Sequence, residues 1–204
     1  MRRTLLTCIT VLALPWMAQS DPARTAPQVI DALHASLLDV MKQATELGYE
    51  GRARTLTPVI IESFDIPFMA RTSIGRHWEQ ASEEERKRFV ETFTRFMVAN
   101  YAGQFDGYSG QHFETLGEEP AIKETLVVKS RLVNPGDEDV QLNYRMRQVG
   151  DKWKILDVYL DGTVSELALR RSEFSSIVRR ENFDALIEAI DAKIAKLASG
   201  SDAS

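Results

Sequence analysis

The sequence predicts an α+β protein in which helices cover one face of a strongly curved antiparallel sheet of about four strands. Apolar residues recur at three- and four-residue steps in the first and last parts of the chain, which is the spacing of amphipathic helices. Between them, residues 111–160 alternate apolar and polar side chains and contain short Gly- and Asp-bearing turns, as successive hairpins do. We expect one domain, residues 27–197, whose helices and sheet enclose an apolar cavity.

The amino-terminal half predicts helices. Apolar residues from Pro27 onward indicate a first helix that ends at Gly48 and Gly51, and a second helical segment follows at residues 52–64. Pro67 marks a break before a further short helix. The clearest helix begins at Ser82, which forms an S-x-x-E capping box with Glu85. Its apolar stripe ordinarily packs in a core, yet it also provides a wide apolar surface: Phe89, Phe93, Phe96, Met97 and Tyr101.

The strands are expected at residues 111–117, 123–133, 140–147 and 152–160. We interpret residues 118–120 as a connector, and residues 134–137 and 150–151 as turns. In the fourth strand, alternation predicts one face with Trp153, Ile155 and Tyr159 and the other with Leu156, Val158 and Leu160. Asp161-Gly162 ends the sheet, and helices are expected at residues 163–180, with Val164 in the apolar set, and from about Asn182 to Leu197.

The first 20 residues have the parts of a secretory signal peptide. Arg2 and Arg3 are followed by an apolar run at residues 5–14 and by small residues at Ala18 and Ser20. The run is too short to cross a bilayer, although an uncleaved anchor is the alternative. We expect cleavage after Ser20 and export to the periplasm. The flanking segments, residues 21–26 and 198–204, are expected to be flexible and disordered, respectively.

Composition limits the possible partners. The full chain of 204 residues carries a formal charge of −5, and the expected signal peptide removes two arginines and no acidic residue, so the mature chain is more acidic still. This balance argues against nucleic acid as a partner and against permanent adhesion to an anionic membrane. The single cysteine, Cys8, lies in the signal peptide, so the mature chain has no disulfide, thiol nucleophile or thiolate metal site.

Few residues suggest catalysis. The three histidines, His34, His77 and His112, lack the clustered spacing of a metal site and are expected at the surface or its boundary. Asp157 and Asp161 could form an acid/base pair, or Asp157 could accept a hydrogen bond at a strand end while Asp161 shapes the turn. Two basic pairs lie on one predicted helix, where they could meet an anionic headgroup or partner, or form intrahelical ion pairs: Arg170-Arg171 and Arg179-Arg180.

Several separated blocks resemble one known family. FDIPFMARTSIGRHWEQASEEERKRFVETFTRFMVANYAGQFDGY, at residues 64–108, is similar to the F-D-x-x-x-M-A-R-x-x-L-G-x-x-W … F-x-x-x-F … Y-A block of the MlaC-like, or toluene-tolerance, periplasmic lipid-binding proteins. The similarity continues through YRMR, WKILDV and R-x-x-x-F and covers about residues 27–197. After the fourth strand, many members contain D-V-x-x-x-G-V-S-L-V-x-N-Y-R, whereas this chain contains DVYLDGTVSELALRRSEF, which resembles the hopanoid-associated HpnM branch.

The resemblance implies an NTF2-like fold with acyl chains between the curved sheet and the helices. It implies a soluble carrier, without cofactor or metal, that moves hopanoid or phospholipid between inner and outer membranes. Membrane complexes would load and unload it by transient docking, and we expect a monomer. Arg170 and Arg171 would contact the headgroup or a partner, and the expected cavity lining is Phe64, Met69, Phe89, Phe93, Phe96, Met97, Tyr101, Val128, Leu142, Tyr144, Met146, Trp153, Ile155, Val158, Leu167 and Phe174.

The sequence also allows two other functions. NTF2-like shells also host small isomerases and dehydratases, and Asp157 would then act as the acid/base residue if it points into the cavity beside a second polar group. The third possibility is a periplasmic adaptor that binds no lipid. A packed interior without a cavity of several hundred Å³ would favour that adaptor.

Overall fold

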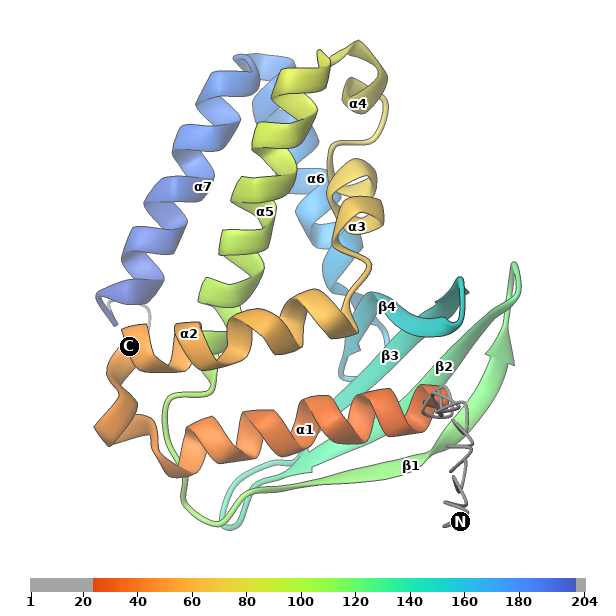
Figure 1. Cartoon of the computed structure of the whole chain (residues 1–204), viewed down its shortest axis with the longest axis vertical. Coiled ribbons are helices and arrows are strands. Elements are labelled where there is room, and N and C mark those ends of the chain that lie inside the picture. The colour runs from red at the N-terminus through yellow and green to blue at the C-terminus, as the bar shows by residue number, and fades with distance from the viewer. Residues whose placement is uncertain (1–23, 201–204) are drawn as a thin grey trace, which may run out of the picture.

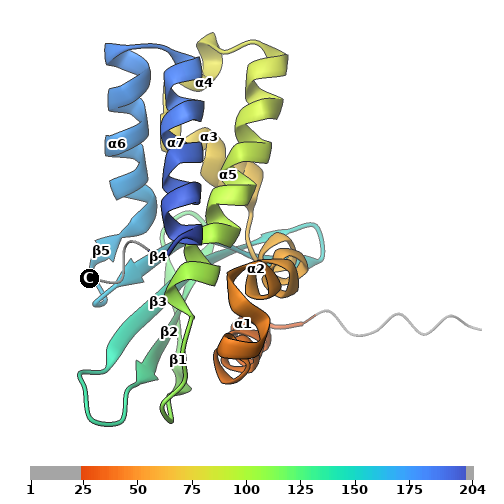
Figure 2. The ribbon, with the colours of Figure 1, turned by 90° about the vertical axis from the view of Figure 1, so that its left-hand side faces the viewer.

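The computed structural model describes residues 24–200. A curved antiparallel sheet forms one end of the molecule, with α1 and α2 lying across its face, and the remaining helices stand together at the other end (Figures 1 and 2). The predicted α+β class is therefore confirmed. The expected signal peptide, residues 21–23 and residues 201–204 lie outside the described residues. Within residues 24–200, none of the helices is both long and apolar enough to cross a membrane.

The helices follow the predicted order, with differences at their ends. The first begins at Ala26, where Thr25 and Gln28 form a capping box, so the expected flexible segment includes the start of this helix. It ends at Lys42 rather than at Gly48, which instead forms a kink with φ 58° inside the next helix. The helices are α1 (Ala26–Lys42), α2 (Ala44–Ser63), α3 (Ile66–Ile74), α4 (His77–Gln80), α5 (Glu83–Gln104), α6 (Glu166–Arg180) and α7 (Phe183–Ala198).

The sheet is a meander in which every neighbouring pair is antiparallel, in the order β1-β2-β3-β4-β5. The expected connector at residues 118–120 is wrong, because these residues pair with 126–128 inside the first strand. Pro120 is tolerated there because β1 lies at the sheet edge, where a missing N–H leaves no ladder bond unmade. The strands are β1 (His112–Ala121), β2 (Thr125–Val133), β3 (Val140–Val149), β4 (Lys152–Leu160) and β5 (Val164–Ser165).

A bulge in β4 changes which of its side chains face the core. Met146 pairs with Ile155, whereas the preceding Arg145 pairs with Asp157, so Leu156 is an extra residue on this strand. The bulge therefore places Ile155 and Val158 on the same face, although strict alternation predicted opposite faces. It also puts Tyr159 on the opposite face from Ile155, because the alternation restarts after the bulge.

Aromatic side chains join the three long helices of the second part. Phe89, Phe93 and Phe96 of α5 pack edge-on against Phe174 of α6, and Phe183 of α7 packs edge-on against Phe89. These rings stabilise the bundle because they remove a large apolar area from water and because edge-to-face ring pairs attract each other. The prediction that Val164 belongs to the apolar face of α6 is wrong, because this residue lies in β5 with 44% of its surface exposed.

The capping box of α5 is confirmed. The Glu85 amide donates to Ser82 Oγ at 3.2 Å, and the Ser82 amide donates to Glu85 Oε2 at 2.7 Å. We predict that Ser82→Ala lowers the free energy of unfolding by about 1 kcal/mol, because the amide of the third helical residue loses its acceptor. Ser82→Asp keeps an acceptor and should retain most of the stability in chemical denaturation. An equal loss in both variants would contradict this role.

Candidate functional site

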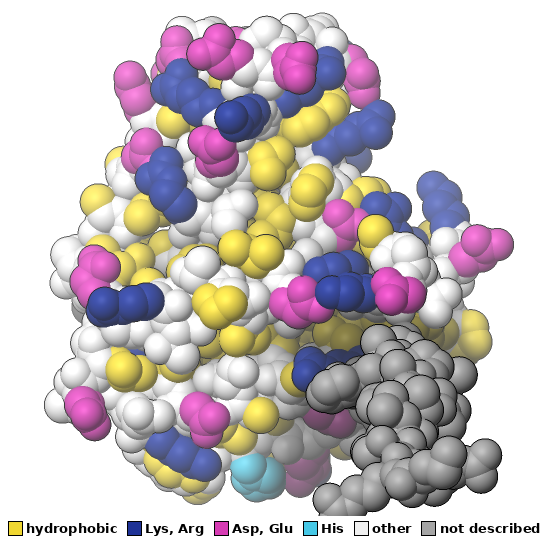
Figure 3. Space-filling view, in the orientation of Figure 1, with side chains coloured by type: hydrophobic (Ala, Val, Ile, Leu, Met, Phe, Trp, Pro, Cys, Tyr) yellow, Lys and Arg dark blue, Asp and Glu magenta, His cyan; other side chains and the backbone are white. Residues whose placement is uncertain are grey.

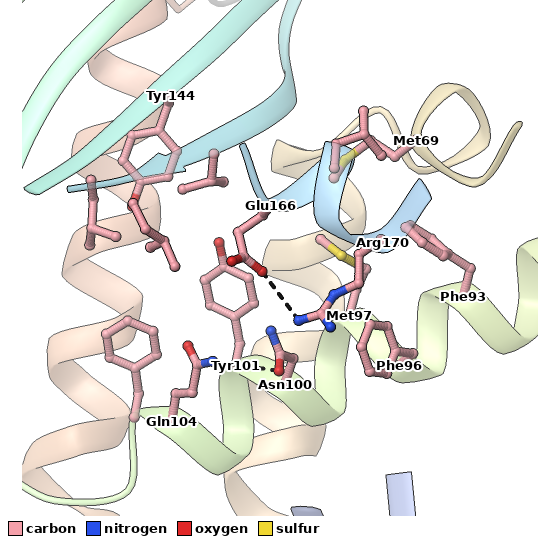
Figure 4. Close-up of a pocket in the computed structure, with 15 residues that line it drawn as sticks. Met69, Phe93, Phe96, Met97, Asn100, Tyr101, Gln104, Tyr144, Glu166 and Arg170 are labelled. Atoms are coloured by element: carbon pink, nitrogen blue, oxygen red, sulfur yellow. Dashed lines mark hydrogen bonds and ion pairs between the residues drawn. The ribbon is translucent and has the colours of Figure 1, made fainter. Parts of the chain in front are cut away.

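A cavity of about 70 Å³ lies where α5 and α6 meet the ends of β3 and β4. Its inner wall is apolar and aromatic, and its rim carries amide and charged groups (Figure 4). Tyr144 points from the sheet toward Tyr101 on α5, and the polar side chains Asn100, Gln104, Glu166 and Arg170 lie around Tyr101 (Figure 4). The residues around the cavity are Met69, Phe93, Phe96, Met97, Asn100, Tyr101, Gln104, Phe105, Leu142, Tyr144, Val158, Leu160, Glu166, Leu167 and Arg170.

The structure brings one part of the expected cavity lining together and places the rest in the packed core. The expected residues that line the cavity are Met69, Phe93, Phe96, Met97, Tyr101, Leu142, Tyr144, Val158 and Leu167. The others lie deeper or farther along the sheet, where neighbouring side chains cover them: Phe64, Phe89, Val128, Met146, Ile155 and Phe174 are buried, and Trp153 is half-buried.

Sequence reasoning missed most of the polar rim. Asn100 and Gln104 follow Phe93 and Met97 on the same side of α5, and the side-chain amide of Gln104 lies 3.5 Å from Asn100 Oδ1. The three- and four-residue spacing that identified the apolar stripe also places these amides beside it. Phe105, Leu160 and Glu166 complete the lining, and they become neighbours of the cavity only when the sheet and α6 come together.

The two adjacent arginines of α6 lie on different sides of the helix. Arg170 faces the cavity, pairs with Glu166 at 3.2 Å and Glu173 at 3.4 Å, and its guanidinium lies 5.1 Å from the centre of the Phe96 ring. Arg171 is exposed and does not line this cavity; its guanidinium packs over Gly75. A headgroup at the rim could therefore meet Arg170, but not both arginines.

His34 is not a surface residue, contrary to the prediction from the sequence. Only 3% of it is exposed; its ring stacks on Phe113 with centroids 3.9 Å apart, and its Nε2 lies 3.1 Å from the Tyr144 hydroxyl. Burial lowers the pKa of His34 to about 4, while nearby Asp31 opposes this shift. The imidazole is thus neutral at neutral pH and fixes the orientation of Tyr144 beside the cavity.

Asp157 does not line the cavity. It is buried where α6 begins, and its carboxylate accepts hydrogen bonds from Ser165 Oγ at 2.6 Å and the Leu167 amide at 3.0 Å. Burial raises the pKa of Asp157, and the hydrogen bonds from Ser165 and Leu167 oppose this shift. Asp161 has φ 49° in the following turn. The sequence allowed either an acid/base pair or two structural roles for these residues. The structure agrees with the structural roles, because Asp157 accepts hydrogen bonds and Asp161 shapes the turn.

The histidines and acidic residues of the described chain form no cluster suited to a metal ion. His112 lies 3.3 Å from Glu114 on β1, and both side chains are exposed. His77 is half-buried at the start of α4, which contains four residues. Neither His77 nor His112 lines the cavity.

Comparison with known proteins identifies the family to which the chain belongs. The model of the MlaC protein family matches residues 31–192, so the chain belongs to the MlaC family. A solved structure of a phospholipid-binding protein from Ralstonia solanacearum, in complex with a phospholipid, has the same fold with a TM-score of 0.74. It is 21% identical, and the alignment covers 86% of this chain and 99% of that protein. Comparison with curated proteins finds no match.

The buried His34 predicts a pH-dependent stability. Unfolded His34 titrates near 6.5 and folded His34 near 4, so the unfolded state binds more protons within this window. The free energy of unfolding therefore falls as pH decreases from about 7 to about 5, with His34 responsible for about 2 kcal/mol. His34→Gln can still hydrogen-bond Tyr144 but does not titrate, so it should lose less stability over this range in denaturant titrations. The same pH dependence in both proteins would contradict the assignment.

Proposed function

We propose that the protein is a periplasmic lipid carrier that holds apolar tails in the cavity between α5, α6 and the sheet. The observation that carries this proposal is the arrangement of an aromatic and aliphatic wall beneath a rim of amides and one ion pair, as an amphipathic ligand requires. Membership of the MlaC family and the phospholipid in the Ralstonia relative support it. The rim residues Asn100, Gln104 and Arg170 would face the headgroup.

The cavity volume implies that lipid uptake widens the site. About 70 Å³ is far below the roughly 300–1,000 Å³ of small-molecule sites, so acyl chains require the helices to move from the sheet. Two methionines, Met69 and Met97, line the wall and can change rotamer to fit an irregular ligand. On α6 only Leu167 and Phe174 are fully buried, which leaves this helix the least embedded of the long helices around the cavity.

The energetics of transfer fit a shuttle without a nucleotide site. Each CH₂ removed from water contributes about 0.8 kcal/mol, so two long acyl chains contribute on the order of 20 kcal/mol and do not escape into water at a useful rate. A bilayer offers nearly the same stabilisation. Exchange between carrier and membrane is then close to balance, and docking complexes in the inner and outer membranes can determine its direction.

The cargo we favour is a hopanoid, with phospholipid as the alternative. The segment that departs from the common family pattern, residues 161–174, forms β5 and the first half of α6. It therefore contributes Glu166, Leu167 and Arg170 to the cavity, so the departure lies at the site where cargo would be distinguished. Our proposal of the HpnM branch rests on the sequence of this segment, DGTVSELALRRSEF. We further propose that the carrier is monomeric and meets its membrane complexes only transiently.

The structure gives no comparable support to an enzyme. Asp157, the candidate acid/base residue, does not line the cavity, and its two oxygens already accept hydrogen bonds from Ser165 and Leu167. Among the described residues, the one carboxylate that lines the cavity is that of Glu166, and it forms an ion pair with Arg170. We therefore assign Asp157 to structure and the cavity to binding.

Extraction of lipid from the purified protein, followed by mass spectrometry, tests the proposal. Leu160 lines the cavity and is half-buried, so Leu160→Trp should fill it. Overpacking of this kind costs about 1–3 kcal/mol, and we expect about tenfold less bound lipid per protein. Leu169→Trp is the matched control, because Leu169 lies on α6 with 49% of its surface exposed and does not line the cavity.

The control should retain the lipid content of the unaltered protein, and circular dichroism should show that both variants fold. Identification of a hopanoid in the extract would support the favoured cargo, and a glycerophospholipid would support the alternative. Protein that is consistently free of lipid and takes up none from liposomes would contradict the carrier and favour the adaptor.

A further inference from the structure

A second concave surface lies on the other side of the beginning of α6. It has a volume of about 370 Å³ and is bounded by α3, the tip of the β1–β2 hairpin, strands β3 and β4, and the first turn of α6. Figure 3 shows Lys and Arg side chains, with acidic side chains beside them, toward the right-hand edge of the molecule, where the tip of the β1–β2 hairpin lies in Figure 1. We call this surface the cationic groove, because four basic side chains line it: Lys123, Arg145, Arg147 and Arg171.

Positive charge dominates the cationic groove, although the whole chain carries −5. Its one acidic lining residue, Asp157, is buried and directed to Ser165 and the Leu167 amide. Arg147 is neutralised by Asp65 at 2.7 Å. Among the described residues, the exposed side chains of Lys123 and Arg171 have no hydrogen-bond or ion-pair partner. Two cations are therefore available to a ligand.

Contacts within the cationic groove anchor Arg145 and pack Arg171. Arg145 donates to Thr125 Oγ1 at 3.1 Å and to the Ile122 carbonyl at 3.3 Å, which ties the hairpin tip to β3. Lys123 has φ 57° at that tip, in the left-handed region that non-glycine residues rarely occupy. Arg171 packs over Gly75, where an added Cβ would lie 3.2 Å from its Nε. These contacts fix Arg145 and the hairpin tip on one side of the groove and place Arg171 of α6 beside Gly75.

The floor of the cationic groove is apolar. Phe68, Leu156 and Leu167 contribute to it, and the Arg147 guanidinium lies 4.5 Å from the centre of the Phe68 ring. Leu167 also lines the cavity of the proposed carrier, so the first turn of α6 separates the two spaces. A ligand that suits this site combines an anionic group with a short apolar portion, and it binds beside the tail cavity.

We propose that the cationic groove binds the phosphate-bearing headgroup of a lipid at a membrane surface. Arginine forks match phosphate oxygens in planar, two-point geometry, and lysine adds a compact charge. The apolar floor fits the glycerol and first methylenes that a lipid has and a free phosphate lacks. Because the remainder of the protein is acidic, such docking is weak and reversible. The site does not depend on the carrier function, since it would operate even if the cavity held no lipid.

Vesicle binding tests this site. Purified protein is sedimented with vesicles of phosphatidylcholine alone, or of phosphatidylcholine mixed with anionic phosphatidylglycerol, at low and at physiological salt. Binding should favour the mixed vesicles and weaken with salt, because exposed charges are screened. Arg171→Ala should weaken this binding about fivefold, and Arg171→Ala with Lys123→Ala about 25-fold, from about 1 kcal/mol per cation near an anionic surface.

Lys87→Ala is the matched control, since it removes the same charge from an exposed position on α5 that lies outside the groove. It should change binding less than about twofold, while the groove variants keep the circular dichroism and melting behaviour of the unaltered protein. Three results would overturn the proposal: equal binding to both vesicle types, an equal loss in Lys87→Ala, or binding of inorganic phosphate or polyglutamate without binding of mixed vesicles. The polyglutamate result would assign the groove to an acidic protein.

Discussion

The buried carboxylate of Asp157 fixes the point at which α6 leaves the sheet, and both concave surfaces depend on that point. A carboxylate shielded from water is stable only when hydrogen bonds replace its hydration, and here Ser165 and the Leu167 amide supply them. These bonds hold the first turn of α6 against β4. Leu167 then contributes to both the cavity and the cationic groove, and the following two arginines face different sides.

Two sides of α6 line different concave surfaces, the cavity and the cationic groove. The face with Arg170 belongs to an apolar cavity whose rim is nearly neutral, because Glu166 and Glu173 pair with that arginine. The face with Arg171 belongs to a groove in which positive charge is left uncompensated. A carrier needs both kinds of surface, one that shields tails from water and one that finds the membrane where tails are exchanged. The adjacent residues Arg170 and Arg171 therefore contribute to two different surfaces, the cavity and the cationic groove.

Local patterns predicted the elements that depend on neighbouring residues. The Ser82–Glu85 capping box and the alternation of β3 were correct, because each follows from spacing within one segment. The bulge at Leu156 was missed, because it depends on how β4 pairs with β3. His34 was placed at the surface because nothing in its own helix reveals that Phe113 and Tyr144 cover it. Tertiary contacts likewise decide which aromatic residues line a cavity and which fill the core.

In the carrier proposed above, lipid loading should separate the α6 side of the cavity from the sheet, because a cavity of about 70 Å³ is too small for acyl chains. Spin labels at Leu169→Cys on α6 and Val149→Cys on β3 measure this directly, since both positions are exposed and Cys8 lies in the expected signal peptide. Pulsed electron paramagnetic resonance should show a longer distance after lipid loading than before. Stoichiometric lipid by native mass spectrometry with an unchanged distance would contradict the account.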